Sequence, residues 1–82
     1  MTNIKVLGTG CATCKRLLAD VKGIVTKNNW QAQVEYVTDL PTIMSYNIMS
    51  TPALVVDEKV LMIGHPGAAK VEAALHKAAF TA

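Results

Sequence analysis

The chain has 82 residues, of which 51% are hydrophobic and only 17% are charged. This length supports one small domain with a single core, and the composition is typical of a compact fold rather than a disordered segment. The net charge of +2 is small and the eight Lys and Arg residues are scattered, so nothing marks a nucleic-acid-binding surface. We therefore expect a single monomeric domain over residues 1–82, without a nucleic-acid partner.

Targeting signals and cysteine usage indicate the cellular compartment in which the protein is expected. The start of the chain, Met1–Lys5, lacks the basic segment and long apolar run of a secretory signal, and no stretch approaches the roughly eighteen apolar residues of a membrane span. A cytoplasmic protein without membrane association is therefore expected. The two cysteines, Cys11 and Cys14, have C-x-x-C spacing. In a reducing cytosol this spacing is typical of redox chemistry or metal binding, since structural disulfides are seldom kept closed there.

The first half of the chain predicts a strand, a helix and a second strand. Ile4–Leu7 is a short apolar run typical of a strand, and Gly8-Thr9-Gly10 provides the turn after it. Apolar residues then recur at helical intervals of three and four: Leu17, Leu18, Val21, Ile24 and Val25. Asn28-Asn29 suits the end of this helix. Gln31–Val37 alternates between polar and apolar residues, as in a strand covered on one face.

A second helix is predicted after this strand. Asp39 can cap a helix that has Pro41 in its first turn and ends near Met49. The residues that keep helical spacing in this segment are Leu40, Ile43, Met44, Asn47 and Ile48.

The remaining pattern predicts a hairpin and a last helix. The apolar runs Ala53–Val56 and Val60–Ile63 flank the polar connection Asp57-Glu58-Lys59, so we expect antiparallel neighbours. Gly64-His65-Pro66-Gly67 ends the second run. A final helical face is then formed by Ala68, Val71, Ala74, Leu75 and Ala78.

The cysteine spacing has a direct chemical meaning. Cys11 would lie at the mouth of the first helix and Cys14 one helical step inside it, close enough to close a small disulfide ring. A thiolate at a helix N-terminus meets unpaired amides and the positive end of the dipole, which can lower the pKa of Cys11. Lys15 either adds a favourable charge by folding back or points into the solvent. The pair therefore suits a disulfide that opens and closes repeatedly.

The predicted order is strand, helix, strand, helix, strand, strand, helix, in which the first crossover gives parallel pairing and the hairpin an antiparallel edge. Together with Gly8-Thr9-Gly10-Cys11-Ala12-Thr13-Cys14-Lys15 and Ser50-Thr51-Pro52-Ala53-Leu54, this order resembles the small redox-active disulfide proteins of the thioredoxin/glutaredoxin superfamily. The resemblance covers nearly the whole chain. It implies an α/β, thioredoxin-like fold with a central four-stranded mixed sheet flanked by three helices.

The resemblance also implies an activity and a set of site residues. Cys11 would attack a disulfide in a target protein, and Cys14 would resolve the mixed disulfide and release the reduced product. In the family a cis-proline packs beside the disulfide, and the residue before it pairs with substrate like an added strand. Transferred here, this makes Thr51 and Pro52 substrate-binding residues, together with Ala12 and Thr13 between the cysteines.

No cofactor or metal beyond the redox-active Cys11–Cys14 disulfide is implied. The expected partners are disulfide-containing target proteins and, as electron donor, a flavin-dependent disulfide reductase supplied by NADPH.

The sequence departs from the better-known relatives at several places, among them Lys5 and the segment 64–67. Lys5 stands six residues before the first cysteine, where thioredoxins bury an acidic residue, so the handling of protons must differ. Glutaredoxins bind glutathione with a Gly-Gly turn followed by Asp, which the segment at 64–67 matches only in part. Glutathione is therefore not indicated as a co-substrate.

The main alternative is a soft-metal carrier, because a Gly-x-x-Cys-x-x-Cys loop before a helix also occurs in copper and mercury chaperones, where two thiolates suit Cu(I) or Hg(II). That family has the order strand, helix, strand, strand, helix, strand, which the helical patterns at 39–49 and at the end of the chain disfavour. Structural zinc is disfavoured because only His65 and His76 remain as ligands, far from the cysteines in sequence. We expect His65 in a turn and His76 on the surface.

A third reading is a partner-binding domain without turnover. Met44, Ile48 and Met49 precede Thr51-Pro52 and suit an apolar docking patch. Methionine at helical spacing is, however, more typical of a core position.

Overall fold

The structure, a computed structural model, describes residues 2–48 and 50–79. The elements in chain order are β1 (Thr2–Leu7), α1 (Ala12–Lys27), β2 (Ala32–Val37), α2 (Leu40–Met44), β3 (Ala53–Val56), β4 (Lys59–Ile63) and α3 (Ala68–Ala79). The predicted element order is confirmed. Within the described ranges, no helix has both the length and the apolar character needed to cross a membrane.

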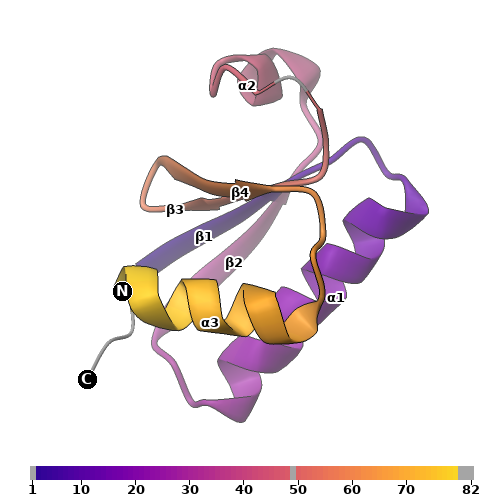
Figure 1. The fold of residues 1–82 in the computed structure, drawn as a ribbon. Helices are drawn as coiled ribbons and strands as arrows, with labels where there is room; N and C mark the ends of the chain where they lie inside the picture. Colours follow the sequence, from indigo (N-terminus) through magenta and orange to yellow (C-terminus); the bar gives the residue numbers. More distant parts are fainter. Residues whose placement is uncertain (1, 49, 80–82) are drawn as a thin grey trace.

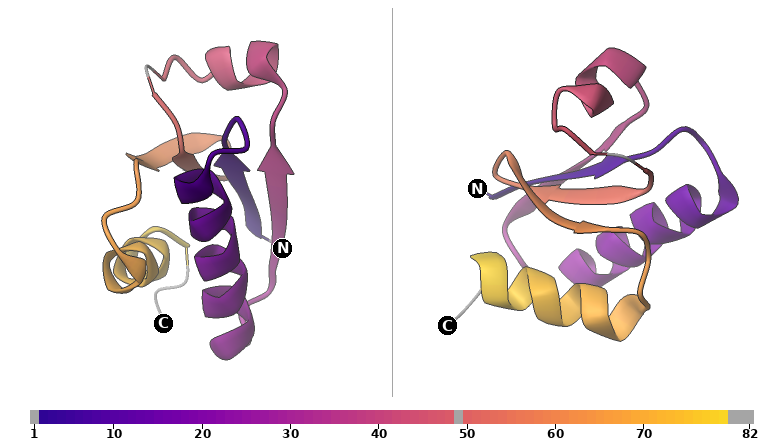
Figure 2. Two further views of the ribbon diagram at one scale, coloured as in Figure 1. Left: turned by 90° about the vertical axis from the view of Figure 1, so that its right-hand side faces the viewer. Right: turned by 45° about the horizontal axis from the view of Figure 1, so that its top comes forward.

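The strands form one mixed sheet in the order β2-β1-β3-β4. β1 pairs in parallel with β2 and antiparallel with β3, and β3 pairs antiparallel with β4. α1 and α3 cover one face of the sheet, while α2 lies on the opposite side (Figures 1 and 2). The predicted four-stranded mixed sheet with three helices is confirmed.

The alternation of side chains along the strands divides the core into two clusters. We call the side covered by α1 and α3 the α1/α3 face and the other side the α2 face. The cluster on the α1/α3 face consists of Ile4, Val6, Leu17, Val21, Ile24, Leu54, Val56, Val71 and Leu75. The smaller cluster on the α2 face consists of Leu7, Val37, Ile43, Ile48, Ala53 and Val55. The buried residues of β1 and β3 therefore alternate between the two clusters along each strand.

Helix α1 begins and ends where the sequence predicts. Cys11 is its N-cap, with extended backbone dihedrals, and Asn28 is its C-cap. The Asn28 amide group donates to the Ile24 carbonyl at 2.9 Å, and Lys27 places a positive charge in the last turn, where it complements the helix dipole.

The prediction for the second helix is wrong in length. α2 comprises only Leu40–Met44, and Asn47 has a φ of +59°, which no helix continues through. The Ser45 hydroxyl donates to the Thr42 carbonyl at 2.5 Å, closing the helix at that point. Met44 is 59% exposed, so the expectation of a core position is wrong for it, whereas Ile48 is buried. Met49 lies outside the described residues.

The β3–β4 hairpin is tighter than predicted. The connection is Asp57-Glu58 alone, because Lys59 already belongs to β4. Both connecting residues have positive φ, +49° and +71°, as a two-residue turn that matches the strand twist requires. A register shift between Leu54 and Val55 leaves Leu61 without a direct partner on β3. The sequence suggested a longer connection because Lys59 is polar and the apolar run begins only at Val60.

Candidate active site

The strand register brings three loops to one edge of the sheet. Leu7, at the end of β1, pairs with Ala53, at the start of β3, and Ala53 also pairs with Ile63, at the end of β4. The residues just beyond these pairs are therefore close in space. Gly64 N–H donates to the Pro52 carbonyl at 2.6 Å. The C-x-x-C loop, the Thr51-Pro52 segment and the turn before α3 thus meet at this edge.

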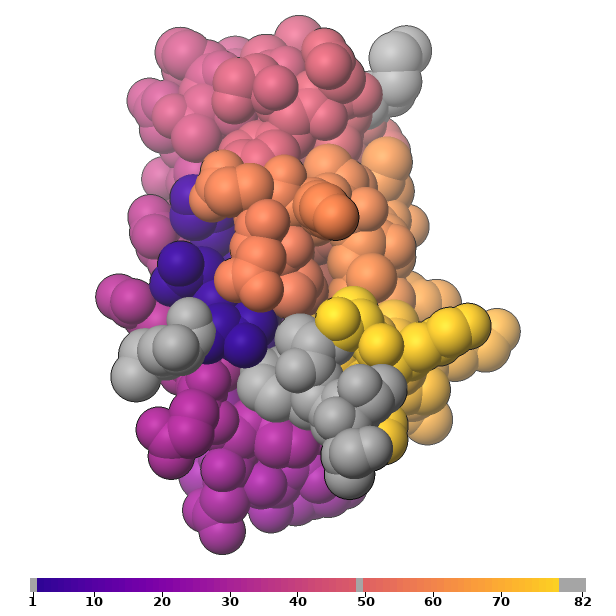
Figure 3. Space-filling view, turned by 90° about the vertical axis from the view of Figure 1, so that its left-hand side faces the viewer, coloured from indigo at the N-terminus to yellow at the C-terminus, as the bar shows by residue number. Residues whose placement is uncertain are grey.

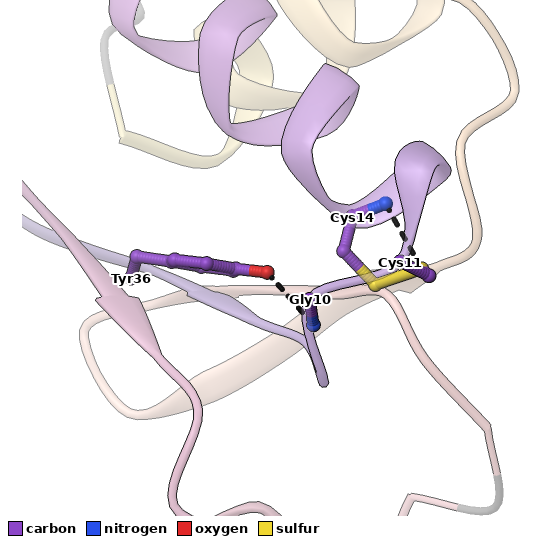
Figure 4. Close-up of a disulfide and its surroundings, with 4 residues drawn as sticks. All are labelled: Gly10, Cys11, Cys14 and Tyr36. Carbon is purple, nitrogen blue, oxygen red and sulfur yellow. Dashed lines mark hydrogen bonds between the residues drawn. A yellow bond between two sulfur atoms is a disulfide. The ribbon is translucent and has the colours of Figure 1, made fainter.

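The two cysteines form a disulfide at the start of α1 (Figure 4). Their Cα atoms are 5.1 Å apart, within the usual range for a disulfide. The Sγ atom of Cys11 also accepts a hydrogen bond from Cys14 N–H at 3.1 Å, which caps the helix. Cys11 is exposed, whereas Cys14 is fully buried. An outside reactant can therefore approach the first sulfur but not the second.

Gly8 is required by a close approach that the sequence did not indicate. A Cβ atom at this position would lie 2.7 Å from Cys14 Cβ and 2.8 Å from Cys14 Sγ, closer than real Cβ atoms come. On the other side, the ring of Tyr36 would be 3.3 Å away. Gly8 therefore does more than permit a turn: its missing side chain makes room for the inner sulfur.

Tyr36 is a second neighbour that sequence reasoning missed. Its ring packs against the cluster on the α1/α3 face, as the alternation in β2 predicts, but its hydroxyl also accepts Gly10 N–H at 3.1 Å. The two residues are separated by 26 positions, so no local pattern signals the contact. It ties the dithiol loop to β2.

The four residues expected to contact substrate lie in the C-x-x-C loop and first turn of α1 and in the Thr51-Pro52 segment, at the same edge of the sheet. Ala12 and Thr13 are exposed in the first turn of α1, whereas Thr51 is half-buried and Pro52 is buried. The Thr51–Pro52 peptide bond is cis. Thr13 also lines a groove of about 410 Å³ that continues away from the dithiol, with Arg16, Asp20, His65, Pro66, Gly67 and Ala68 as its other lining residues.

His65 is a structural element of this groove rather than only a turn residue. Its side chain is 5% exposed, and its Nδ1 atom accepts the Gly67 N–H at 3.1 Å. Because Nδ1 is an acceptor, the ring proton is on Nε2, which donates to the Asp20 carboxylate at 2.6 Å. His65 thus links α1 to the turn before α3.

The described ranges contain no group of three or more His, Cys, Asp or Glu residues placed to hold a metal ion. His76 is exposed and lies beside Trp30, with ring centroids 6.2 Å apart. Lys15 is exposed and forms no ion pair with a described residue.

Lys5 lies on the α2 face, opposite the helix that carries Cys14. Its Nζ atom is 2.7 Å from a Glu58 carboxylate oxygen and 3.3 Å from the Tyr46 hydroxyl, which in turn donates to Glu58 at 2.9 Å. The hydrogen bond to Glu58, and secondarily that to Tyr46, raises the pKa of Lys5, while that of Glu58 is lowered mainly by Lys5. The space-filling view shows the hairpin directly against the segment around α2, which this network bridges (Figure 3).

Comparison with known proteins agrees with this geometry. A family model described as "Thioredoxin domain" matches residues 2–76. The chain is 28% identical over 64 residues to a thioredoxin from Methanothermobacter thermautotrophicus, covering 78% of this chain and 83% of that protein. It is also similar in fold to thioredoxin 1 from Thermosipho africanus, with a TM-score of 0.66, 15% identity and coverage of 92% and 91% of the two chains. The observed element order, strand, helix, strand, helix, strand, strand, helix, differs from the order strand, helix, strand, strand, helix, strand of the copper and mercury carriers. With its Cys11–Cys14 disulfide, the chain belongs to the thioredoxin domain family and to its thiol–disulfide oxidoreductases.

Proposed function

We propose that this protein reduces disulfides in target proteins, with Cys11 as the attacking thiol and Cys14 as the resolving thiol. The observation that carries the proposal is the difference in exposure between the two sulfurs, since only Cys11 is accessible and Cys14 is fully buried. An exposed sulfur at a helix N-terminus is placed to be ionised and to react with a large partner. A buried neighbour is placed to react only within the molecule.

The exchange has two steps. The Cys11 thiolate attacks one sulfur of the target disulfide, forming a Cys11–target disulfide and releasing the other target sulfur as a thiolate. Cys14 then loses its proton and attacks the Cys11 sulfur, which releases the second target thiolate and forms the Cys11–Cys14 disulfide seen in the structure. Two electrons pass to the target. In the cytoplasm, a flavin-dependent disulfide reductase supplied by NADPH would then give two electrons to this protein and restore its dithiol.

The target segment would lie along the edge where the three loops meet. Thr51 is half-buried and lies two residues before β3, where its backbone would pair with an extended peptide in the manner of an added strand. The buried Pro52 follows Thr51, and the exposed Ala12 and Thr13 follow Cys11 in the first turn of α1, so these residues would contact the target as well. The 28%-identical protein from Methanothermobacter thermautotrophicus, a thioredoxin by name, supports this class of substrate.

Trapping of the mixed disulfide tests the assignment. In Cys14→Ser protein the second step is blocked, so a disulfide-bonded model protein should remain attached through Cys11 and be seen as a higher-mass band without reductant. Cys11→Ser is the matched control and should trap at least tenfold less, because its remaining thiol is buried. Trapping through Cys14 instead would contradict the assignment of roles.

A further inference from the structure

Tyr36 stands at the end of β2 with its hydroxyl directed at the loop that carries the dithiol (Figure 4). The hydroxyl oxygen accepts the Gly10 N–H at 3.1 Å. Gly10 immediately precedes Cys11 and has a φ of +92°, a conformation that glycine adopts without steric cost. The contact therefore fastens the backbone next to the exposed sulfur to a strand of the sheet.

Few other contacts restrain this loop. At its start Gly8 N–H donates to the Val37 carbonyl, and at its end Lys15 N–H donates to the Cys11 carbonyl, each at 3.0 Å. Among the hydrogen bonds of the described residues, the one from Gly10 to Tyr36 is the only one that holds the backbone of residues 9–10 between these two points. The disulfide adds a covalent restraint, which disappears when the protein is reduced.

The position of the Cys11 sulfur is critical in the reduced protein. There it can accept the Cys14 N–H and lie at the positive end of α1, and both interactions favour the ionised sulfur. The dipole effect falls off within the first turn, so a sulfur that swings outward loses it. A loop with two glycines, Gly8 and Gly10, has a large conformational freedom to restrict.

We propose that Tyr36 is a positioning residue for the exchange reaction. By holding Gly10, its hydroxyl keeps the Cys11 sulfur over the start of α1 after the disulfide has opened, and so favours the thiolate. This inference rests on the proposed function, in which Cys11 is the attacking thiol. Tyr36 acts through the backbone of the loop and not on the target.

Tyr36→Phe isolates the hydroxyl, because the ring that packs beside Gly8 remains. Tyr46→Phe is the matched control, since it removes a hydroxyl from the α2 face. We would measure the rate of Cys11 alkylation by iodoacetamide against pH, with every protein reduced and carrying Cys14→Ser. Tyr36→Phe should move the midpoint of the profile upward and slow alkylation below it about three- to fivefold, the worth of one ordinary hydrogen bond. The plateau at high pH should not change, and Tyr46→Phe should match the parent.

A second readout tests the tether itself. In the reduced protein the Gly10 amide should exchange its hydrogen faster in Tyr36→Phe than in the parent, as followed by NMR. A parent midpoint near that of free cysteine, about 8.5, would overturn the proposed function and this inference together. A lowered parent midpoint that Tyr36→Phe shares would overturn the role of Tyr36 alone. A reduced melting temperature without a shifted midpoint would do the same, because it would show a purely structural contact.

Discussion

The two faces of the sheet are built on different principles. The α1/α3 face is apolar throughout its described core and supports the helix that carries the dithiol. The α2 face has a smaller apolar cluster beside the network of Lys5, Tyr46 and Glu58, and it is covered by the five-residue helix α2 and by Tyr46 and Ile48 in the segment after it. Lys5 is on β1, the strand that leads into the dithiol loop, but its side chain points away from α1. The difference indicates that the larger apolar core lies behind the reacting sulfurs, whereas the smaller core of the α2 face adjoins a network of charged and hydroxyl groups.

Truncating one core residue on each face should cause the largest losses in the free energy of unfolding. Leu54→Ala removes a fully buried side chain on the α1/α3 face and should lower the free energy of unfolding by about 3 kcal/mol. Ile43→Ala on the α2 face should cost about 2 kcal/mol, because a short helix at the surface can relax toward the gap. Urea unfolding of both variants measures the difference. A larger loss for Ile43→Ala would show that the α2 face carries the stability.

The next largest change in stability is expected at Gly8, which leaves space for the sulfur of Cys14. Gly8→Ala should lower the free energy of unfolding by about 1–3 kcal/mol, because its Cβ would collide with Cys14. Gly23→Ala is the matched control: Gly23 lies in α1 with no atom within 4 Å of an added Cβ, so the change should raise stability by about 0.5–1 kcal/mol. Thermal unfolding of the oxidised proteins compares them. Equal stability in the two variants would contradict the close approach at Gly8.

The smallest expected effect is the pH dependence that the Glu58 carboxylate on the α2 face gives to the free energy of unfolding. Because the pKa of Glu58 is lowered in the folded protein, the carboxylate stabilises the fold above its unfolded pKa of about 4.3. That contribution is lost as the pH falls through the lower, folded pKa. Glu58→Gln should therefore be less stable at pH 7 and lose less stability between pH 5 and 3, measured by urea unfolding at each pH.

Glu72→Gln provides the comparison from the other face. The pKa of Glu72 is also lowered, chiefly by Asn28 and then by Lys27. Replacing Glu72 should therefore also reduce the dependence of the free energy of unfolding on pH between pH 5 and 3. The reduction should be smaller, since Lys27 is 3.3 Å from Glu72 whereas Lys5 is 2.7 Å from Glu58. The reverse order would remove the distinction between the charged networks of the two faces.

Local patterns were sufficient for most of the architecture. Alternation marked the covered face of β2, and helical spacing identified Val71 and Leu75 as the buried face of α3. They failed where a single residue ended or shortened an element, as at Asn47 after α2 and at the glycine-free turn of Asp57-Glu58. In both places residues other than glycine have a positive φ, which asparagine and aspartate adopt more readily than most residues but which no helical or strand periodicity signals.

By itself, the sequence determined the order of the elements and the placement of Cys11 and Cys14 at a helix start, because periodicity and C-x-x-C spacing act over a few neighbouring residues. The tertiary structure decided what surrounds those sulfurs. It placed Tyr36 against Gly10, made Gly8 the space for the Cys14 sulfur, buried His65 against Asp20 and turned Lys5 to the α2 face. Most of these contacts join residues that are far apart in the sequence, and patterns over a few neighbouring residues do not show which of them meet.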